Sequence, residues 1–239
     1  MNHPEQHTAA ESFGEILISS RSLDEYRAMF ALTEDDLGRR ILDCPSGAAE
    51  FTAEICGRGG DVTACDLAYA NNGLERVAAG AVAQAERGNR YVRAHQDLYA
   101  WSFFAGPDEH LRQRSAAAAR FAAHTEHDAG RYVAGRLPTL PFPDSDFELA
   151  LSSHLLFSYA ADLDYEFHLR AVLELTRVAR EVRIFPLVPV GSDTRYPLLD
   201  MLLAELGEHD VLGRIVDVDY EFQKGGNEML VCRRGAPAP

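Results

Sequence analysis

Ile41-Leu42-Asp43-Cys44-Pro45-Ser46-Gly47-Ala48-Ala49 is the stretch that decides the fold, together with Asp61-Val62-Thr63-Ala64-Cys65-Asp66 farther along the chain. The pattern predicts an apolar strand, a tight turn of small residues, a helix, and a second strand that ends in a carboxylate. A helix that starts directly after such a turn directs unpaired N–H groups at whatever the turn holds. The carboxylate ending the second strand is placed to accept hydrogen bonds from a ribose diol. We therefore expect half of a nucleotide-binding unit.

The composition restricts the class of protein. The chain has 239 residues, enough to bury a sizeable core, and is most simply a single domain. No run of residues approaches the roughly 18 consecutive apolar positions that a membrane span needs. The polar start, Met1–Ala10, lacks the pattern of a secretory signal. The formal charge of −14 argues against nucleic acid or an anionic membrane as the main partner.

The cysteines and histidines predict no metal site. Cys44, Cys56, Cys65 and Cys232 are scattered in a pattern that matches neither zinc-ligand spacing nor a disulfide framework. We therefore expect buried thiols and a reducing cytoplasm as the location. The histidines of His124-Thr-Glu-His127 have helical spacing but no companion carboxylate cluster, so we expect a solvated helix end there.

The hydrophobic pattern predicts strands that alternate with helices. Residues 1–36 form a disordered-looking tail and a cap helix, which the capping box Ser22-Leu-Asp-Glu25 opens. The predicted strands are 41–44, 61–66, 131–134, 147–152 and 181–188. The predicted helices lie near 48–56, 72–86, 107–122, 165–179 and after Pro197.

This alternation implies a single α/β domain over residues 37–239 with a doubly wound, mostly parallel, seven-stranded sheet. Two extended runs, 216–222 and 228–233, flank Gly225-Gly226-Asn227 and predict a β-hairpin that makes the last strand antiparallel. The segment from about 90 to 130 is expected to be a helical insertion that also carries an aromatic group around Trp101.

This organisation resembles the class I methyltransferases, which use S-adenosylmethionine (SAM), over about Leu37 to Arg233. The first motif of that family is typically Asp-x-Gly-x-Gly-x-Gly, and Asp43-Cys-Pro-Ser-Gly-Ala-Ala49 matches it with Pro and Ala in place of the outer glycines. Leu140-Pro-Phe-Pro-Asp-Ser-Asp-Phe-Glu-Leu-Ala-Leu-Ser-Ser-His154 is similar to the stretch that leads into strand four in many small-molecule members. Arg177-Val-Ala-Arg-Glu-Val-Arg-Ile-Phe-Pro186 is similar to the stretch before their fifth strand.

The resemblance implies SAM as the cofactor and points to residues that would hold it. In the family, the acid matching Asp43 helps to organise the methionine end of SAM, while Asp66 would bind the ribose. Arg136 stands where many relatives carry an Asp that contacts the adenine amine; since Arg cannot accept that hydrogen bond, backbone here would do so. The candidate cofactor-binding residues are Asp43, Pro45, Ser46, Gly47, Phe51, Asp66, Leu67, Arg136, Leu137, Ser152 and Ser153.

His154 is the candidate catalytic residue, because residues after strand four face the transferred methyl group in this family. Its imidazole would accept a proton from a hydroxyl or amine of the methyl acceptor. The alternative is a structural histidine packed under the cofactor. The candidate substrate residues are Tyr26, Tyr99, Trp101 and Phe157, and Tyr26 with Arg21 would close over the cofactor unless the first helix is an ordinary packed cap.

The sequence thus favours a cytoplasmic, SAM-dependent methyltransferase that acts on an O, N or C atom of a small molecule. Two other function classes stay open. The first is a nicotinamide-dependent oxidoreductase, which would have a fuller Gly-x-Gly-x-x-Gly turn than this chain and no antiparallel terminal hairpin. A non-catalytic relative would bind the cofactor, or a protein partner, without turnover. Neither the aromatic insertion nor His154 encodes the identity of the acceptor.

Overall fold

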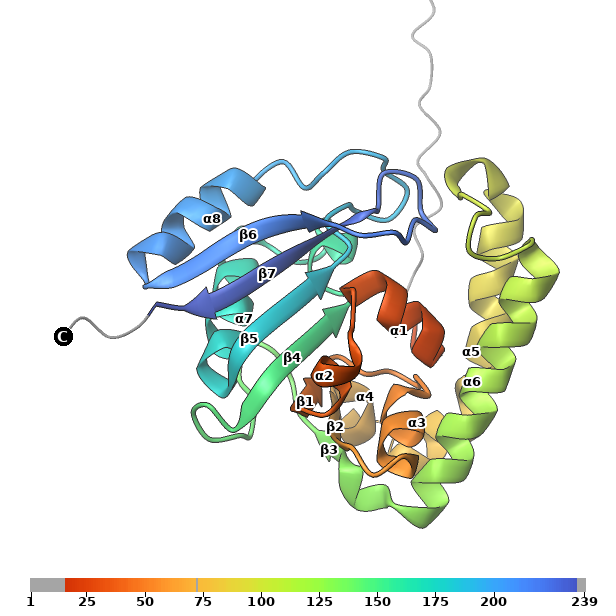
Figure 1. Ribbon diagram of the computed structural model, residues 1–239. Coiled ribbons are helices and arrows are strands. Elements are labelled where there is room, and N and C mark those ends of the chain that lie inside the picture. Colours follow the sequence, from red (N-terminus) through yellow and green to blue (C-terminus); the bar gives the residue numbers. More distant parts are fainter. Residues whose placement is uncertain (1–15, 72, 236–239) are drawn as a thin grey trace, which may run out of the picture.

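The computed structural model describes residues 16–71 and 73–235, and its centre is one seven-stranded sheet (Figure 1). The strand order is β3-β2-β1-β4-β5-β7-β6, and β7 runs antiparallel to both of its neighbours. This confirms the predicted fold class, the α/β arrangement of the class I methyltransferases. The strands are β1 Arg40–Asp43, β2 Asp61–Asp66, β3 Tyr132–Ala134, β4 Phe147–Ser153, β5 Ala179–Phe185, β6 Val211–Asp217 and β7 Glu228–Arg234.

Helices cover both faces of the sheet (Figure 1). Alternate residues of a strand point to opposite faces, so Leu42 packs in the cluster that includes α7 and α8, whereas Ile41 packs in the cluster that includes α1 and α3. The described helices are α1 Leu23–Phe30, α2 Glu34–Leu37, α3 Phe51–Gly57, α4 Leu67–Asn71, α5 Leu74–Ala94, α6 Pro107–His127, α7 Tyr165–Val178 and α8 Leu199–Glu208. Short 3-10 turns lie at Gln96–Leu98, Ala129–Arg131 and Phe157–Tyr159.

Only part of the predicted N-terminal tail lies within the described residues, which begin at residue 16. Residues 1–15 of the expected tail lie outside the described part of the chain, whereas residues 16–21 are described and run across the first turn of the sheet. The capping box of α1 is present, since the Ser22 side chain accepts from the Glu25 N–H and the Glu25 carboxylate accepts from the Ser22 N–H. Tyr26, Met29 and Phe30 of this helix are buried in the core, which supports the alternative of a packed cap helix.

The expected insertion, residues 90 to about 130, contains the end of α5, an aromatic loop and the long helix α6, and α6 packs side by side with α5 (Figure 1). Helix α5 starts close to the predicted position but continues to Ala94, beyond the predicted end near residue 86. Helix α6 has Pro107 in its first turn, as expected, because a missing N–H costs nothing there.

The predicted hairpin at the C-terminus is wrong in its first strand. Strand β6 covers Val211–Asp217 and pairs with β7, but residues 218–227 form a long connection instead of a tight turn. The reason is burial elsewhere: Tyr220 is 1% exposed and donates a hydrogen bond of 2.9 Å to Glu25 of α1. Phe222 packs against aromatic residues of the insertion, and its carbonyl accepts from the Ala100 N–H at 2.7 Å. The connection therefore ties the insertion and α1 to the edge of the sheet.

The other sequence expectations concern cysteines, metals and membranes. All four cysteines are free thiols, three of them buried and Cys56 half-buried. His124 lies beside Tyr132, whose hydroxyl is 2.8 Å from the His124 Nδ1. Over residues 16–71 and 73–235, no three His, Cys, Asp or Glu side chains group closely enough to bind a metal ion. None of the helices in that part of the chain combines the length and apolar character of a membrane span.

Candidate active site

The turn after β1 is closed by the protein's own chain. Each backbone N–H from Ser46 to Glu50 donates to a protein acceptor: Cys65 O (3.1 Å), Asp66 Oδ2 (2.8 Å), Ser19 O (2.9 Å), Ser46 O (3.2 Å) and Arg21 O (3.1 Å), in that order. Helix α3 begins only at Phe51. The expectation of a helix near residue 48, with unpaired N–H groups facing the turn, is therefore wrong, because the segment 19–21 already accepts two of these bonds.

Gly47 is the position where the turn requires a glycine. Its φ of +59° lies in the left-handed region, and a Cβ at this position would be 2.7 Å from the Ser19 carbonyl oxygen. The Gly47 carbonyl accepts a hydrogen bond of 2.7 Å from the Tyr69 hydroxyl. The glycine thus allows the N-terminal segment to lie directly against the turn.

Asp43, at the end of β1, is fully buried beneath this turn. The Tyr26 hydroxyl lies 3.0 Å from both of its carboxylate oxygens, and the Tyr26 ring stacks on Phe51 at 4.6 Å. Burial, with a smaller contribution from Asp66, raises the pKa of Asp43 to about 7, although hydrogen bonding by Ser46 and Tyr26 opposes this shift. Asp43 is not among the residues that line the cavities described below. Asp43 therefore contacts Tyr26 beneath the turn and does not itself face either cavity.

Asp66, at the end of β2, does line a cavity. Its Oδ2 accepts from the Gly47 N–H and its Oδ1 accepts from the Ala68 N–H, both at 2.8 Å. Burial raises the pKa of this carboxyl in spite of the two bonds. A carboxylate has about four acceptor positions, so each oxygen retains capacity for a further donor.

A large cavity of about 770 Å³ opens at the carboxyl ends of β1, β2 and β4, which is the ligand-binding edge of open α/β sheets. It falls within the roughly 300–1,000 Å³ range of small-molecule and cofactor sites. Its walls are more apolar than polar, and their polar side chains are Ser19, Asp66, Asn71, Gln84, Arg87, Arg136, Ser153 and His154. The predicted cofactor-binding residues that line it are Pro45, Gly47, Asp66, Leu67, Arg136, Leu137 and Ser153.

The residues around this cavity fit the cofactor that the resemblance implies. Asp66 offers a desolvated carboxylate with free acceptor capacity, as a ribose diol requires. Leu67, Leu137 and Phe167 supply apolar surface for an adenine ring. The turn itself has no free N–H between Ser46 and Glu50, so carboxylate and side-chain contacts would carry more of the binding than in a glycine-rich turn.

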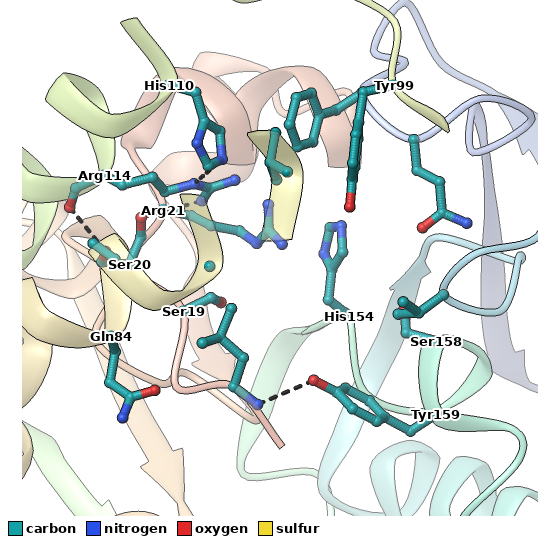
Figure 2. Close-up of a pocket in the computed structure, with 17 residues that line it drawn as sticks. Ser19, Ser20, Arg21, Gln84, Tyr99, His110, Arg114, His154, Ser158 and Tyr159 are labelled. Carbon is teal, nitrogen blue, oxygen red and sulfur yellow. Dashed lines mark hydrogen bonds between the residues drawn. The ribbon is translucent and has the colours of Figure 1, made fainter. Parts of the chain in front are cut away.

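A smaller cavity of about 100 Å³ adjoins the large one (Figure 2). The two share four lining residues, Leu17, Ser19, Gln84 and His154. The N-terminal segment forms much of this shared wall and is fixed there, because the Leu17 N–H donates to the Tyr159 hydroxyl at 3.0 Å. In Figure 2, Tyr99 approaches from above and its hydroxyl end points toward the His154 imidazole.

His154 stands between the two cavities. It has a φ of +53°, and its backbone N–H donates to the Phe185 carbonyl at 2.7 Å, which fixes the residue at the end of β4. Its Nδ1 is buried without a hydrogen-bond partner in the described structure. Burial, together with Arg21 and Arg114, lowers the pKa of the imidazole well below its usual value. A neutral imidazole with an unused nitrogen is able to accept a proton.

Several predicted site residues do not reach either cavity. Phe51 packs on Tyr26 in the core, and Phe157 packs against His168 and Tyr196. Trp101 lies against Phe222 outside the lining residues. Ser46 and Ser152 are buried and line neither cavity, and the Ser152 hydroxyl lacks a hydrogen-bond partner in the described part of the chain. Of the predicted substrate residues, Tyr99 lines the small cavity, while Tyr26 holds Asp43.

His110 and Arg114 line the small cavity from α6 but were not among the predicted site residues. Their signal was spacing: they lie four residues apart and in register with the buried Ala117, Ala118 and Phe121. Polar residues in the buried register of a helix indicate either a buried network or a site.

The comparisons with known proteins begin with a relative. An uncharacterized protein of Methanocaldococcus jannaschii is 32% identical over 219 residues, which cover 91% of this chain and 96% of that protein. The chain belongs to the family of this archaeal protein. No protein-family model matches the sequence.

Several solved structures with a similar arrangement are described as SAM-dependent methyltransferases or as methyltransferases. The Burkholderia thailandensis 1,6-didemethyltoxoflavin-N1-methyltransferase, solved with its substrate and S-adenosylhomocysteine, is 14% identical, with 88% of this chain and 78% of that one covered and a TM-score of 0.47. A SAM-dependent methyltransferase from Aquifex aeolicus is 15% identical, with 88% and 87% covered and a TM-score of 0.41. Both likenesses concern the fold alone.

Proposed function

We propose that this protein is a SAM-dependent methyltransferase whose acceptor is a small molecule methylated at O, N or C. One observation carries the proposal: a cofactor-sized cavity and a smaller one meet at His154, at the carboxyl edge of the sheet. The large cavity would hold SAM between Asp66 and the apolar residues Leu67 and Leu137. The small cavity would admit part of the acceptor.

The sulfonium group of bound SAM supplies an already activated methyl group, so the protein mainly needs to hold the acceptor in line with it. Ser19, Gln84 and His154, which line both cavities, would fix the relative position of the two ligands. The buried Nδ1 of His154, which has no hydrogen-bond partner in the described structure, supports a role as acceptor for a hydroxyl or amine hydrogen of the methyl acceptor. The depressed pKa leaves the imidazole neutral but makes it a weaker base than a solvent-exposed histidine.

Calorimetric titration with SAM and with S-adenosylhomocysteine tests the proposal. We expect both to bind to the intact protein at a single site, and Asp66→Ala to weaken both. Failure of both ligands to bind would refute the function. Methyl transfer from labelled SAM into fractions of a cell extract would then identify the acceptor fraction.

A second candidate, a relative that binds SAM without turnover, is favoured by the closed turn, in which the segment 19–21 occupies positions next to Gly47. Binding without any methyl transfer into extract fractions would support it. The nicotinamide-dependent alternative is disfavoured by the antiparallel β7.

The preference for a small acceptor rests on charge. A net charge of −14 repels nucleic acid, although one similar structure, from Pyrococcus horikoshii, is described as a candidate RNA methyltransferase. The cytoplasmic location stays a prediction based on the scattered free cysteines.

A further inference from the structure

The small cavity is bordered by a buried charge cluster with more cations than anions. Arg21, Arg114 and Glu25 are 7%, 5% and 0% exposed. Glu25 Oε1 accepts from both guanidinium groups, at 3.2 Å from Arg21 and 2.8 Å from Arg114, and from the Tyr220 hydroxyl at 2.9 Å. Within residues 16–71 and 73–235, Glu25 is the carboxylate that forms ion pairs with these two arginines. Two positive charges therefore face one negative charge.

The two histidines nearby add no charge of their own. The imidazole of His110 stacks on Phe222 and accepts a hydrogen bond of 3.2 Å from Arg114 Nε. Burial and the neighbouring arginines hold the pKa values of both His110 and His154 well below the usual range. Burial and Arg21 also lower the pKa of Arg114, as expected where positive charge is undercompensated.

Arg21 is the arginine that presents the uncompensated positive charge to the small cavity. Arg114 is well satisfied, since it donates to Glu25, to His110 and to the Ser20 carbonyl. Arg21 donates through Nη1 to Glu25, whereas its Nε is buried and has no hydrogen-bond partner in the described structure. In Figure 2 its guanidinium group extends into the cavity toward His154. His154 Nδ1 is likewise without a partner.

A buried cation with an unused donor is costly unless a ligand neutralises it. We propose that the small cavity binds a carboxylate group of the methyl acceptor, with Arg21 as its ion-pair partner. This inference deepens the proposed function, on which its reference to the acceptor rests. Arg21 would hold the acid end of the molecule and leave its nucleophilic atom toward His154 and the large cavity.

Charge and size favour a carboxylate over a phosphate. The cluster has one uncompensated positive charge, which a carboxylate balances, whereas a phosphate monoester carries about −1.5 to −2 at neutral pH. A planar carboxylate also matches the planar edge of a guanidinium group. The cavity volume of about 100 Å³ has room for a carboxylate and a few further atoms, so the rest of the acceptor would extend into the large cavity.

Titration with propionate, followed through the NMR signals of the His154 imidazole, tests this proposal directly. Propionamide, which has nearly the same shape but no charge, is the matched ligand control, and inorganic phosphate tests the other anion. Arg21→Gln is the test variant. Arg112→Gln is the control, because Arg112 is an exposed residue of the same helix as Arg114. Thermal unfolding of each variant shows whether it is folded.

We expect saturable shifts with propionate, none with propionamide, and propionate binding at least about tenfold weaker in Arg21→Gln than in Arg112→Gln. The proposal is overturned if neither ligand binds, if propionamide or phosphate binds as well as propionate, or if Arg21→Gln binds propionate normally. Should Arg21→Gln not fold, the comparison of propionate with propionamide on the unaltered protein decides. A parallel titration with S-adenosylhomocysteine tests the two proposals separately. If S-adenosylhomocysteine binds and propionate does not, the carboxylate site is refuted and the proposed function stands. If propionate binds and S-adenosylhomocysteine does not, the proposed methyltransferase function is refuted and the carboxylate site stands.

Discussion

Asp43→Asn should make the protein more stable at alkaline pH than the unaltered chain. The carboxyl of Asp43 has a pKa of about 7 in the folded protein, against 3.8 for an aspartate side chain exposed to water, because it is fully buried. Between these two values the folded state retains a proton that the unfolded state has released, so the free energy of unfolding falls as pH rises. The difference of about 3 pKa units corresponds to about 4 kcal/mol at 1.36 kcal/mol per unit.

Urea denaturation at about pH 5 and about pH 8 measures this effect. Roughly 3 kcal/mol of the difference between variant and unaltered protein should develop over that interval. Tyr26→Phe retains the titration and removes the hydroxyl that donates to Asp43, so it should destabilise mainly at the higher pH. Asp36→Asn is a control without pH dependence over this interval: hydrogen bonds from Thr33 and Arg183 lower the pKa of Asp36 against the effect of burial, so its carboxyl is ionised in both the folded and the unfolded state between about pH 5 and about pH 8. A stability difference for Asp43→Asn that is the same at both pH values would refute the reasoning.

Three further predictions concern the cavity walls. Asp66→Ala should weaken SAM binding by about 1–3 kcal/mol, measured by calorimetry, because a ribose would lose a charged acceptor; unchanged affinity would remove Asp66 from the site. Gly47→Ala should lower the free energy of unfolding in urea by roughly 1–3 kcal/mol, since the added Cβ would meet the Ser19 carbonyl. Gly59→Ala is the control: its φ is also positive, but a Cβ there has open space, so the loss should be smaller. Equal losses of stability in the two variants would contradict the close contact between Gly47 and Ser19. His154→Gln should slow methyl transfer into extract fractions by about 10²–10⁴-fold if the imidazole takes a proton. A rate near that of the unaltered protein would leave His154 a structural role.

The sheet was predictable because its strands carry local signals. The buried strands Ile41–Cys44 and Phe147–Ser152 are short apolar runs between turn residues, and the structure has them within one residue at each end. Helix α3 was placed too early because Ala48 and Ala49 suit a helix as well as a turn. The extended run 216–222 was misassigned because burial of its aromatic residues depends on α1, which lies nearly 200 residues earlier in the chain.

The candidate site was predictable where one motif supplies the residue. Pro45, Gly47 and Asp66 follow strand ends, and parallel strand ends meet at one edge, so these residues do reach the large cavity. The charge cluster was not predictable in this way. Arg21 and Arg114 meet across 93 positions of sequence, and no local pattern indicates that the capping residue Glu25 also pairs with both.

The N-terminal segment, which supplies Leu17 and Ser19 to the wall between the two cavities, makes contacts with residues far along the chain. Leu17 is held by Tyr159, which lies 142 residues later, and Ser20 is held by Arg114, 94 residues later. The Leu17 contact therefore forms only after β4 and the segment that follows it have been synthesised, whereas the Ser20 contact needs the chain only as far as α6. The wall that the two cavities share is therefore completed late, and shortened chains that end before Tyr159 would leave Leu17 without its hydrogen bond at that wall.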